Sequence, residues 1–128
     1  MNAKFNRIML VDDDVNTNIY NEIILNQVKA AEEILVYQNG KQALDFLETA
    51  DKKVDLIFLD INMPIMNGWQ FLEKYKELED AKKAGSVVVM LTTSMNSEDK
   101  EKAFEYGVVG DFISKPLSPE ALQEILNR

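Results

Sequence analysis

This chain of 128 residues contains no cysteine and no histidine, two residue types on which much enzyme chemistry depends. The absence of cysteine excludes disulfide bonds and thiolate metal sites, and it suits the reducing cytoplasm, where we expect the protein to be located. The absence of histidine excludes serine–histidine and cysteine–histidine catalysis, and zinc sites built on imidazole. A metal site in this chain is therefore expected to use oxygen ligands.

Positive charge is also scarce, with 14 basic against 22 acidic residues and a net charge of −8. The longest basic runs are pairs, Lys52-Lys53 and Lys82-Lys83. Nucleic acids and anionic membrane surfaces attract clustered Lys and Arg, so we expect neither as a partner. No apolar stretch approaches the ~20 residues of a membrane span, and the first residues lack the apolar segment of a signal peptide.

What the chain does contain is typical of one globular domain, with 46% hydrophobic and 28% charged residues. There is no internal linker, repeat or low-complexity tract. We expect a single domain over residues 1–128, with no output domain after the last predicted helix.

Short apolar segments alternate with segments of helical spacing along the chain. Continuous apolar runs of this kind predict strands buried on both faces, at residues 8–11, 34–37, 56–59, 87–91 and 108–113. Helices are expected between and after them, from about residues 15 to 29, from 39, from 69 to about 78, from 97 and from 118. Asp14 is expected to cap the first helix, which carries Ile19, Ile23 and Gln27 on one face. This alternation predicts an α/β fold, with five helices on a doubly wound, five-stranded parallel sheet.

Polar side chains follow four of the five predicted strands. In open parallel sheets, ligands bind beyond the carboxyl ends of the strands. Taken singly, an aspartate there is usually a helix cap or part of a solvated turn, a threonine is more often structural, and a lysine is usually a solvated charge. Together at one edge they indicate a site, made of Asp12-Asp13-Asp14, Asp60, Thr92 and Lys115.

Three carboxylates within ~5 Å of one another repel by about 3 kcal/mol per pair at an effective dielectric of ~20. They either take up protons or gather a cation, and oxygen ligands suit Mg²⁺. A carboxylate beside such a cation, facing a hydroxyl and an ammonium, can accept a phosphoryl group as an acyl phosphate.

Four stretches resemble the receiver domain of two-component response regulators, in order and at suitable spacing. They are Ile8 to Asp14, Asp55 to Gly68, Met90 to Ser94 and Phe112 to Pro116. The resemblance implies a stand-alone, chemotaxis-receiver-like response regulator with the flavodoxin-like strand order 2-1-3-4-5. It would be a signalling protein rather than an enzyme, catalysing only its own phosphorylation and dephosphorylation.

The resemblance also implies a role for each site residue. Asp60 would be the phosphoacceptor, and Asp12 and Asp13 would hold Mg²⁺ with it. The backbone carbonyl of Asn62 would be a further metal ligand. Thr92 would bind the phosphoryl group. Lys115 would pair with Asp60 before the transfer and with the phosphoryl group after it.

Phe112 matches the family's aromatic switch position, so Thr92 and Phe112 would move together on phosphorylation. Alternatively, Phe112 has no role in switching and only packs in the hydrophobic core.

The implied phosphoryl donor is a histidine kinase or a phosphotransfer protein, because this chain has no histidine of its own. After phosphorylation the chain would either control a protein partner or pass the phosphoryl group on in a phosphorelay. The donor would dock near the first helix, at Asn16, Thr17, Ile19 and Tyr20. A downstream protein target, or a phosphorylation-dependent homodimer, would use the surface formed by the fourth helix, the fifth strand and the fifth helix. Its apolar residues include Phe104, Tyr106 and Phe112.

Three other functions are compatible with parts of the pattern. An aspartyl phosphatase would use the spacing of the Asp12-Asp13-Asp14 run, but it would need a cap domain. A flavodoxin-like cofactor carrier would need amide-rich Ser, Thr and Gly after the first strand rather than aspartates. A phosphorylation-independent binding module would not need the acidic site.

Overall fold

The computed structural model describes residues 5–49, 53–61, 63, 66–78, 87–92, 97–107, 109–115 and 117–127. Its centre is a five-stranded parallel sheet in the order β2-β1-β3-β4-β5. The strands are β1 (Phe5–Val11), β2 (Ala31–Tyr37), β3 (Leu56–Asp60), β4 (Val87–Thr92) and β5 (Val109–Ser114). Within the described ranges, five helices accompany them: α1 (Val15–Gln27), α2 (Gly40–Thr49), α3 (Gly68–Tyr75), α5 (Ser97–Glu105) and α6 (Pro119–Leu126). The predicted fold class and strand order are confirmed.

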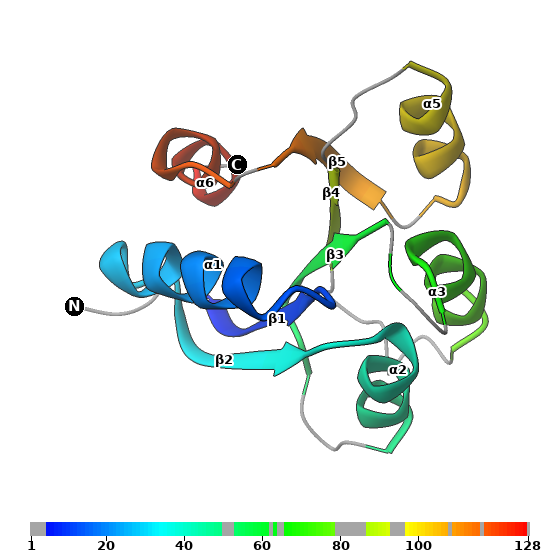
Figure 1. The fold of residues 1–128 in the computed structure, drawn as a ribbon, viewed down its shortest axis with the longest axis horizontal. Coiled ribbons are helices and arrows are strands. Elements are labelled where there is room, and N and C mark those ends of the chain that lie inside the picture. The colour runs from blue at the N-terminus through cyan, green and yellow to red at the C-terminus, as the bar shows by residue number, and fades with distance from the viewer. Residues whose placement is uncertain are drawn as a thin grey trace.

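The helices cover both faces of the sheet, with α1 and α6 on one side and α2, α3 and α5 on the other (Figure 1). Side chains of a strand point alternately to the two faces, so a strand between two helical layers must be apolar at every position. In β1, Ile8 and Leu10 join one hydrophobic core while Met9 and Val11 join the other. All five residues of β3 are buried in the same way.

The prediction that every strand is buried on both faces is wrong for the two edge strands. In β2 no residue is fully buried, and Val36 is 39% exposed. In β5 buried and exposed positions are mixed along the strand. The apolar run in β2 gave no sign of this, because an edge position depends on strand order rather than on local composition.

Helix α1 begins as predicted, with the Asp14 carboxylate accepting hydrogen bonds from the backbone N–H of Asn16 at 2.9 Å and of Thr17 at 3.4 Å. It ends at Gln27, earlier than expected, and Lys29 takes a left-handed conformation with φ of 53°. The last helix also begins as predicted, with Ser118 as its N-cap and Pro119 in its first turn.

The buried face of α1 differs from the expected one. Ile19 and Ile23, expected on the helix's apolar face, are 52% and 51% exposed. The residues that α1 buries are Asn18, Asn21, Ile24 and Leu25. Spacing alone did not choose between the faces, because the helix has apolar residues on both. None of the helices in the described part of the chain is long and apolar enough to cross a membrane.

Candidate functional site at the carboxyl edge of the sheet

The strand register brings the expected site residues to one edge of the sheet. Val11 pairs with Leu59, so Asp12 and Asp60 follow at the same level of the two central strands. Asp60 pairs with Leu91, and Thr92, the next residue of β4, pairs with Ser114 of β5. The loops after these strands therefore start from neighbouring points.

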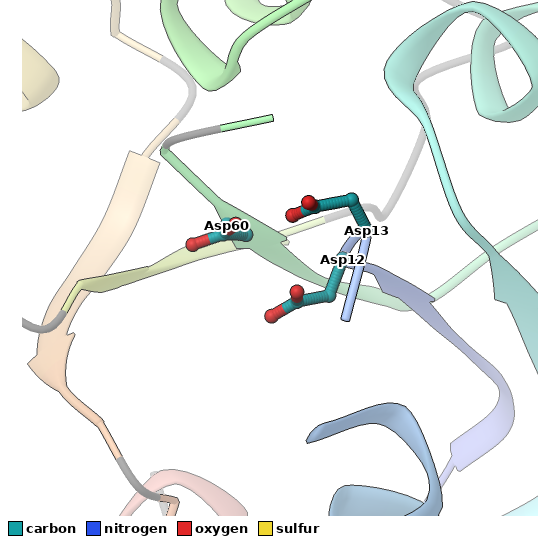
Figure 2. Close-up of side chains that lie close together, drawn as sticks. All are labelled: Asp12, Asp13 and Asp60. Carbon is teal, nitrogen blue, oxygen red and sulfur yellow. The ribbon is translucent and has the colours of Figure 1, made fainter. Parts of the chain in front are cut away.

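Three carboxylates meet at this edge. Figure 2 shows Asp12 and Asp13 at the end of β1 and Asp60 at the end of β3, with their carboxylates turned to the same side. One oxygen from each lies within 4.8 Å of the others, which is close enough for a shared cation. Asp12 and Asp60 are buried, at 3% and 6% exposed, whereas Asp13 is exposed. The site thus has two buried carboxylates and one that faces solvent.

Lys115 reaches across the edge from the end of β5. Its Nζ lies 2.9 Å from Oδ1 of Asp60 and 2.7 Å from Oδ2 of Asp12. The backbone N–H of Lys115 donates to the carbonyl of Thr92 at 2.7 Å, which continues the β4–β5 pairing past the ends of the strands. The contact with Asp60 was expected from the resemblance, but the shorter one with Asp12 was not.

The surroundings raise the pKa of both Asp60 and Lys115. Burial raises the pKa of Asp60 to about 6, aided by the charges of Asp12 and Asp13 and opposed by Lys115. Burial disfavours the charged form of Lys115, but its hydrogen bonds to Asp12 and Asp60 outweigh this and raise its pKa. Lys115 is therefore an ammonium at neutral pH, while Asp60 is a carboxylate that is easily protonated.

Asp12 is fixed by its own neighbours as well. Its Oδ1 accepts a hydrogen bond from the backbone N–H of Asp14 at 2.9 Å. Its carbonyl oxygen accepts a hydrogen bond from Nδ2 of Asn18 at 2.8 Å. Asn18 is a residue of this site that the sequence analysis missed. An asparagine four residues after a helix cap was the only signal, and such residues are usually exposed on helices.

Thr92 is buried, at 3% exposed, and lies at the end of β4 as expected. Phe112 is also 3% exposed and packs in the same hydrophobic core as Met90, its neighbour across the β4–β5 pairing. The expectation that Phe112 contributes to a docking surface is wrong for this conformation, because its side chain is inside. Asn62, expected to offer its carbonyl, lies outside the described residues.

The chain returns to the sheet at Gly68, directly behind Asp60. A Cβ atom at Gly68 would lie 2.8 Å from both the carbonyl oxygen of Asp60 and Cα of Ile61. The backbone N–H of Gly68 donates to the carbonyl of Ile61 at 2.7 Å. Only glycine allows this contact between backbones, which holds the start of α3 against the end of β3.

Comparison with known proteins gives the class of this fold and site. Residues 8–127 match the response regulator receiver domain. The chain is 42% identical over 113 residues to a protein-glutamate methylesterase/protein-glutamine glutaminase of Desulfotalea psychrophila, covering 86% of this chain but 29% of that protein. It is 32% identical over 126 residues to two-component response regulator 24 of Arabidopsis thaliana, covering 98% of this chain and 84% of that protein.

Solved structures agree with these relatives. A two-component response regulator from Cytophaga hutchinsonii superposes with a TM-score of 0.86 at 33% identity, covering 95% of this chain and 94% of that one. The chemotaxis protein CheY4 of Vibrio cholerae superposes with a TM-score of 0.80 at 27% identity, covering 97% and 98%. The chain belongs to the response regulator receiver domains of two-component signalling. It spans 29% and 7% of the first two curated relatives, which are longer proteins.

Proposed function

We propose that this receiver domain takes a phosphoryl group from a phosphohistidine donor onto Asp60, with Mg²⁺ bound beside it. The observation that carries the proposal is the meeting of the Asp12, Asp13 and Asp60 carboxylates, within 4.8 Å, with the Lys115 ammonium in contact with two of them. Such a cluster serves little purpose for folding, because like charges brought together oppose it.

In the proposed transfer, a carboxylate oxygen of Asp60 attacks the phosphorus atom. An O–P bond forms, the N–P bond to the donor imidazole breaks, and the imidazole keeps the bonding electron pair. The attack requires the deprotonated carboxylate, and a pKa of about 6 leaves most of Asp60 in that form at neutral pH. Lys115 stays beside the acquired charge as a counter-ion.

The residues of the site fit a hard divalent cation. The carboxylates of Asp12, Asp13 and Asp60 offer only oxygen, and the chain contains neither histidine nor cysteine to favour a softer metal. We assign Mg²⁺ to these three residues, with the carbonyl of Asn62 as a fourth ligand on the strength of the family resemblance. When bound, Mg²⁺ would neutralise the carboxylates and the charge of the phosphoryl oxygens.

Thr92 and Phe112 are the proposed switch. Thr92 ends β4 next to the site, and Phe112 is buried two positions before Ser114, the β5 partner of Thr92. In the proposed phosphorylated state the Thr92 hydroxyl donates to a phosphoryl oxygen, and Phe112 moves into the space that Thr92 leaves. The phosphoryl group then acts by favouring one of two existing conformations.

The donor is proposed to dock on the outer face of α1. Val15, Ile19 and Ile23 follow one another at four-residue spacing on this helix and are 49%, 52% and 51% exposed, with Tyr20 beside them at 41%. An apolar stripe of this kind on a helix that starts at the acidic site suits a helical phosphohistidine protein. The proposed output surface is formed by α5, β5 and α6, with Phe104 of α5 42% exposed. It would bind a protein target or a second phosphorylated copy of the chain.

Intact-mass spectrometry tests the transfer. The native protein is incubated with acetyl phosphate and MgCl₂, and Asp60→Asn is treated in parallel. We expect one labile phosphoryl group on the native protein and none on the variant. Phosphate release far in excess of protein would instead indicate a phosphatase, and an unmodified native protein would contradict the proposal.

A second comparison tests the docking face. Ile19→Glu is expected to slow transfer from a phosphotransfer protein that phosphorylates the native chain, because it places a charge in the apolar stripe. Phosphorylation by acetyl phosphate, which needs no protein contact, should be unchanged. Equal slowing with both donors would show that the substitution acts on the site rather than on docking.

A further inference from the structure

Helix α1 buries two asparagines one turn apart. Asn18 is 3% exposed and Asn21 is 2% exposed, on the face that packs toward the sheet. Burying a side-chain amide is unfavourable unless its polar atoms find partners. Among the described residues, the Oδ1 atoms of Asn18 and Asn21 both lack one. Leucine or isoleucine at these positions would suit packing better.

The two asparagines differ in one contact. Nδ2 of Asn18 donates to the carbonyl oxygen of Asp12 at 2.8 Å, across six residues of chain. No bond from the Asn21 side chain to the acidic turn is found in the described part of the chain. The bond from Asn18 joins the second turn of α1 to the last residue before Asp13.

The bond completes a set of contacts that fixes Asp12. Its backbone N–H donates to the carbonyl of Tyr37 at 3.1 Å, its Oδ1 accepts from Asp14 and its Oδ2 accepts from Lys115. The carbonyl oxygen is the remaining polar group of Asp12, and Asn18 is its donor. The turn that carries Asp12 and Asp13 is therefore held from both the strand side and the helix side.

We infer that Asn18 is a positioning residue for the metal site: it holds the β1–α1 turn so that Asp12 and Asp13 stay near Asp60 against their mutual repulsion. The inference rests on the proposed function, because it concerns the same acidic site. Without the bond, the like charges push the turn away from Asp60, and a cation must draw it back on binding. Partners that orient metal ligands typically change metal affinity by about 10–100-fold when removed.

The alternative is a purely structural role, in which Asn18 only satisfies a buried carbonyl group. Asn21 provides the matched control, since it lies on the same helix, is equally buried and has the same unpartnered Oδ1. Replacing either asparagine with leucine keeps the branched shape and the number of side-chain heavy atoms, and it adds the same extra volume at both positions. Only the replacement of Asn18 removes the bond to Asp12.

The experiment is an Mg²⁺ titration of the native protein, Asn18→Leu and Asn21→Leu, followed by amide chemical shifts at a temperature well below all three unfolding midpoints. We expect Asn18→Leu to bind Mg²⁺ about tenfold more weakly than native and Asn21→Leu to stay within about twofold of native. Asn18→Ser, whose hydroxyl is too short to replace the amide directly, should also lose affinity and serves if the leucine variant does not fold.

The outcomes separate the two proposals. If the native protein binds Mg²⁺ at the acidic site and the Asn18 and Asn21 variants have the same affinity, the positioning role is wrong and the proposed function stands. If the loss of affinity in each variant simply follows its loss of stability, the role of Asn18 is structural. If the native protein shows no saturable Mg²⁺ binding at Asp60, the proposed function fails together with the inference.

Discussion

Replacing Asp60 with asparagine should stabilise the metal-free protein. The pKa of Asp60 rises from 3.8 to about 6, with burial as the main cause, so the folded state holds its proton more tightly than the unfolded chain. For an acid shifted upward, the folded state binds more protons between about pH 4 and 6, and stability falls as pH rises through that window. Above this pH window, the raised pKa of Asp60 corresponds to a destabilisation of the folded state by roughly 3 kcal/mol. Asparagine has the same shape and no charge, so it removes this penalty.

Urea unfolding in EDTA measures the effect. At pH 7.5, Asp60→Asn is expected to exceed the native protein by up to about 3 kcal/mol in free energy of unfolding, and at pH 5 by about half as much. Asp45→Asn is the control, because Asp45 lies in an exposed pair with Lys41 and should change stability by less than about 0.5 kcal/mol. If Asp60→Asn is less stable than the native protein, or if its added stability does not depend on pH, the buried charge of Asp60 does not destabilise the fold as argued.

Three further predictions concern the surroundings of Asp60. Lys115→Met should tighten Mg²⁺ binding roughly tenfold or more, because the ammonium competes with the cation for Asp12 and Asp60; weaker binding in a titration would contradict this. Gly68→Ala should lower the free energy of unfolding by about 1–3 kcal/mol, since its Cβ meets fixed backbone; Gly40→Ala, which meets the flexible side chain of Met66, should lose less. Asp14→Ala should lower the urea midpoint, because it removes the cap of α1. Asp14→Asn should keep the midpoint close to that of the native protein, because asparagine can also cap a helix.

The fold was predictable because it follows from patterns that are local in the sequence. Continuous apolar runs gave the central strands, and the helix starts at Asp14 and Ser118 were marked by capping residues. The convergence of the aspartates with Lys115 followed from the direction of parallel strands, since their carboxyl ends share one edge. The direction of the strands alone is enough to predict that these side chains lie at the same edge.

What the sequence did not reveal depends on packing between distant segments. Ile19 and Ile23 were expected on the apolar face of α1, yet that helix buries Asn18 and Asn21 instead. Ile19 and Ile23 face outward, because the sheet packs against the opposite face of α1. The helix sequence alone does not show which face meets the sheet. Likewise, the second contact of Lys115, with Asp12, depends on the placement of a flexible side chain between two acids.

The most direct test of phosphorylation at Asp60 is to locate the modified residue. Native protein treated with acetyl phosphate and Mg²⁺ is reduced with borohydride, which converts an aspartyl phosphate to homoserine, and is then digested and sequenced by mass spectrometry. Homoserine at position 60 alone is the predicted result. Homoserine at position 12 or 13, or no conversion under conditions that phosphorylate another receiver domain, would contradict it.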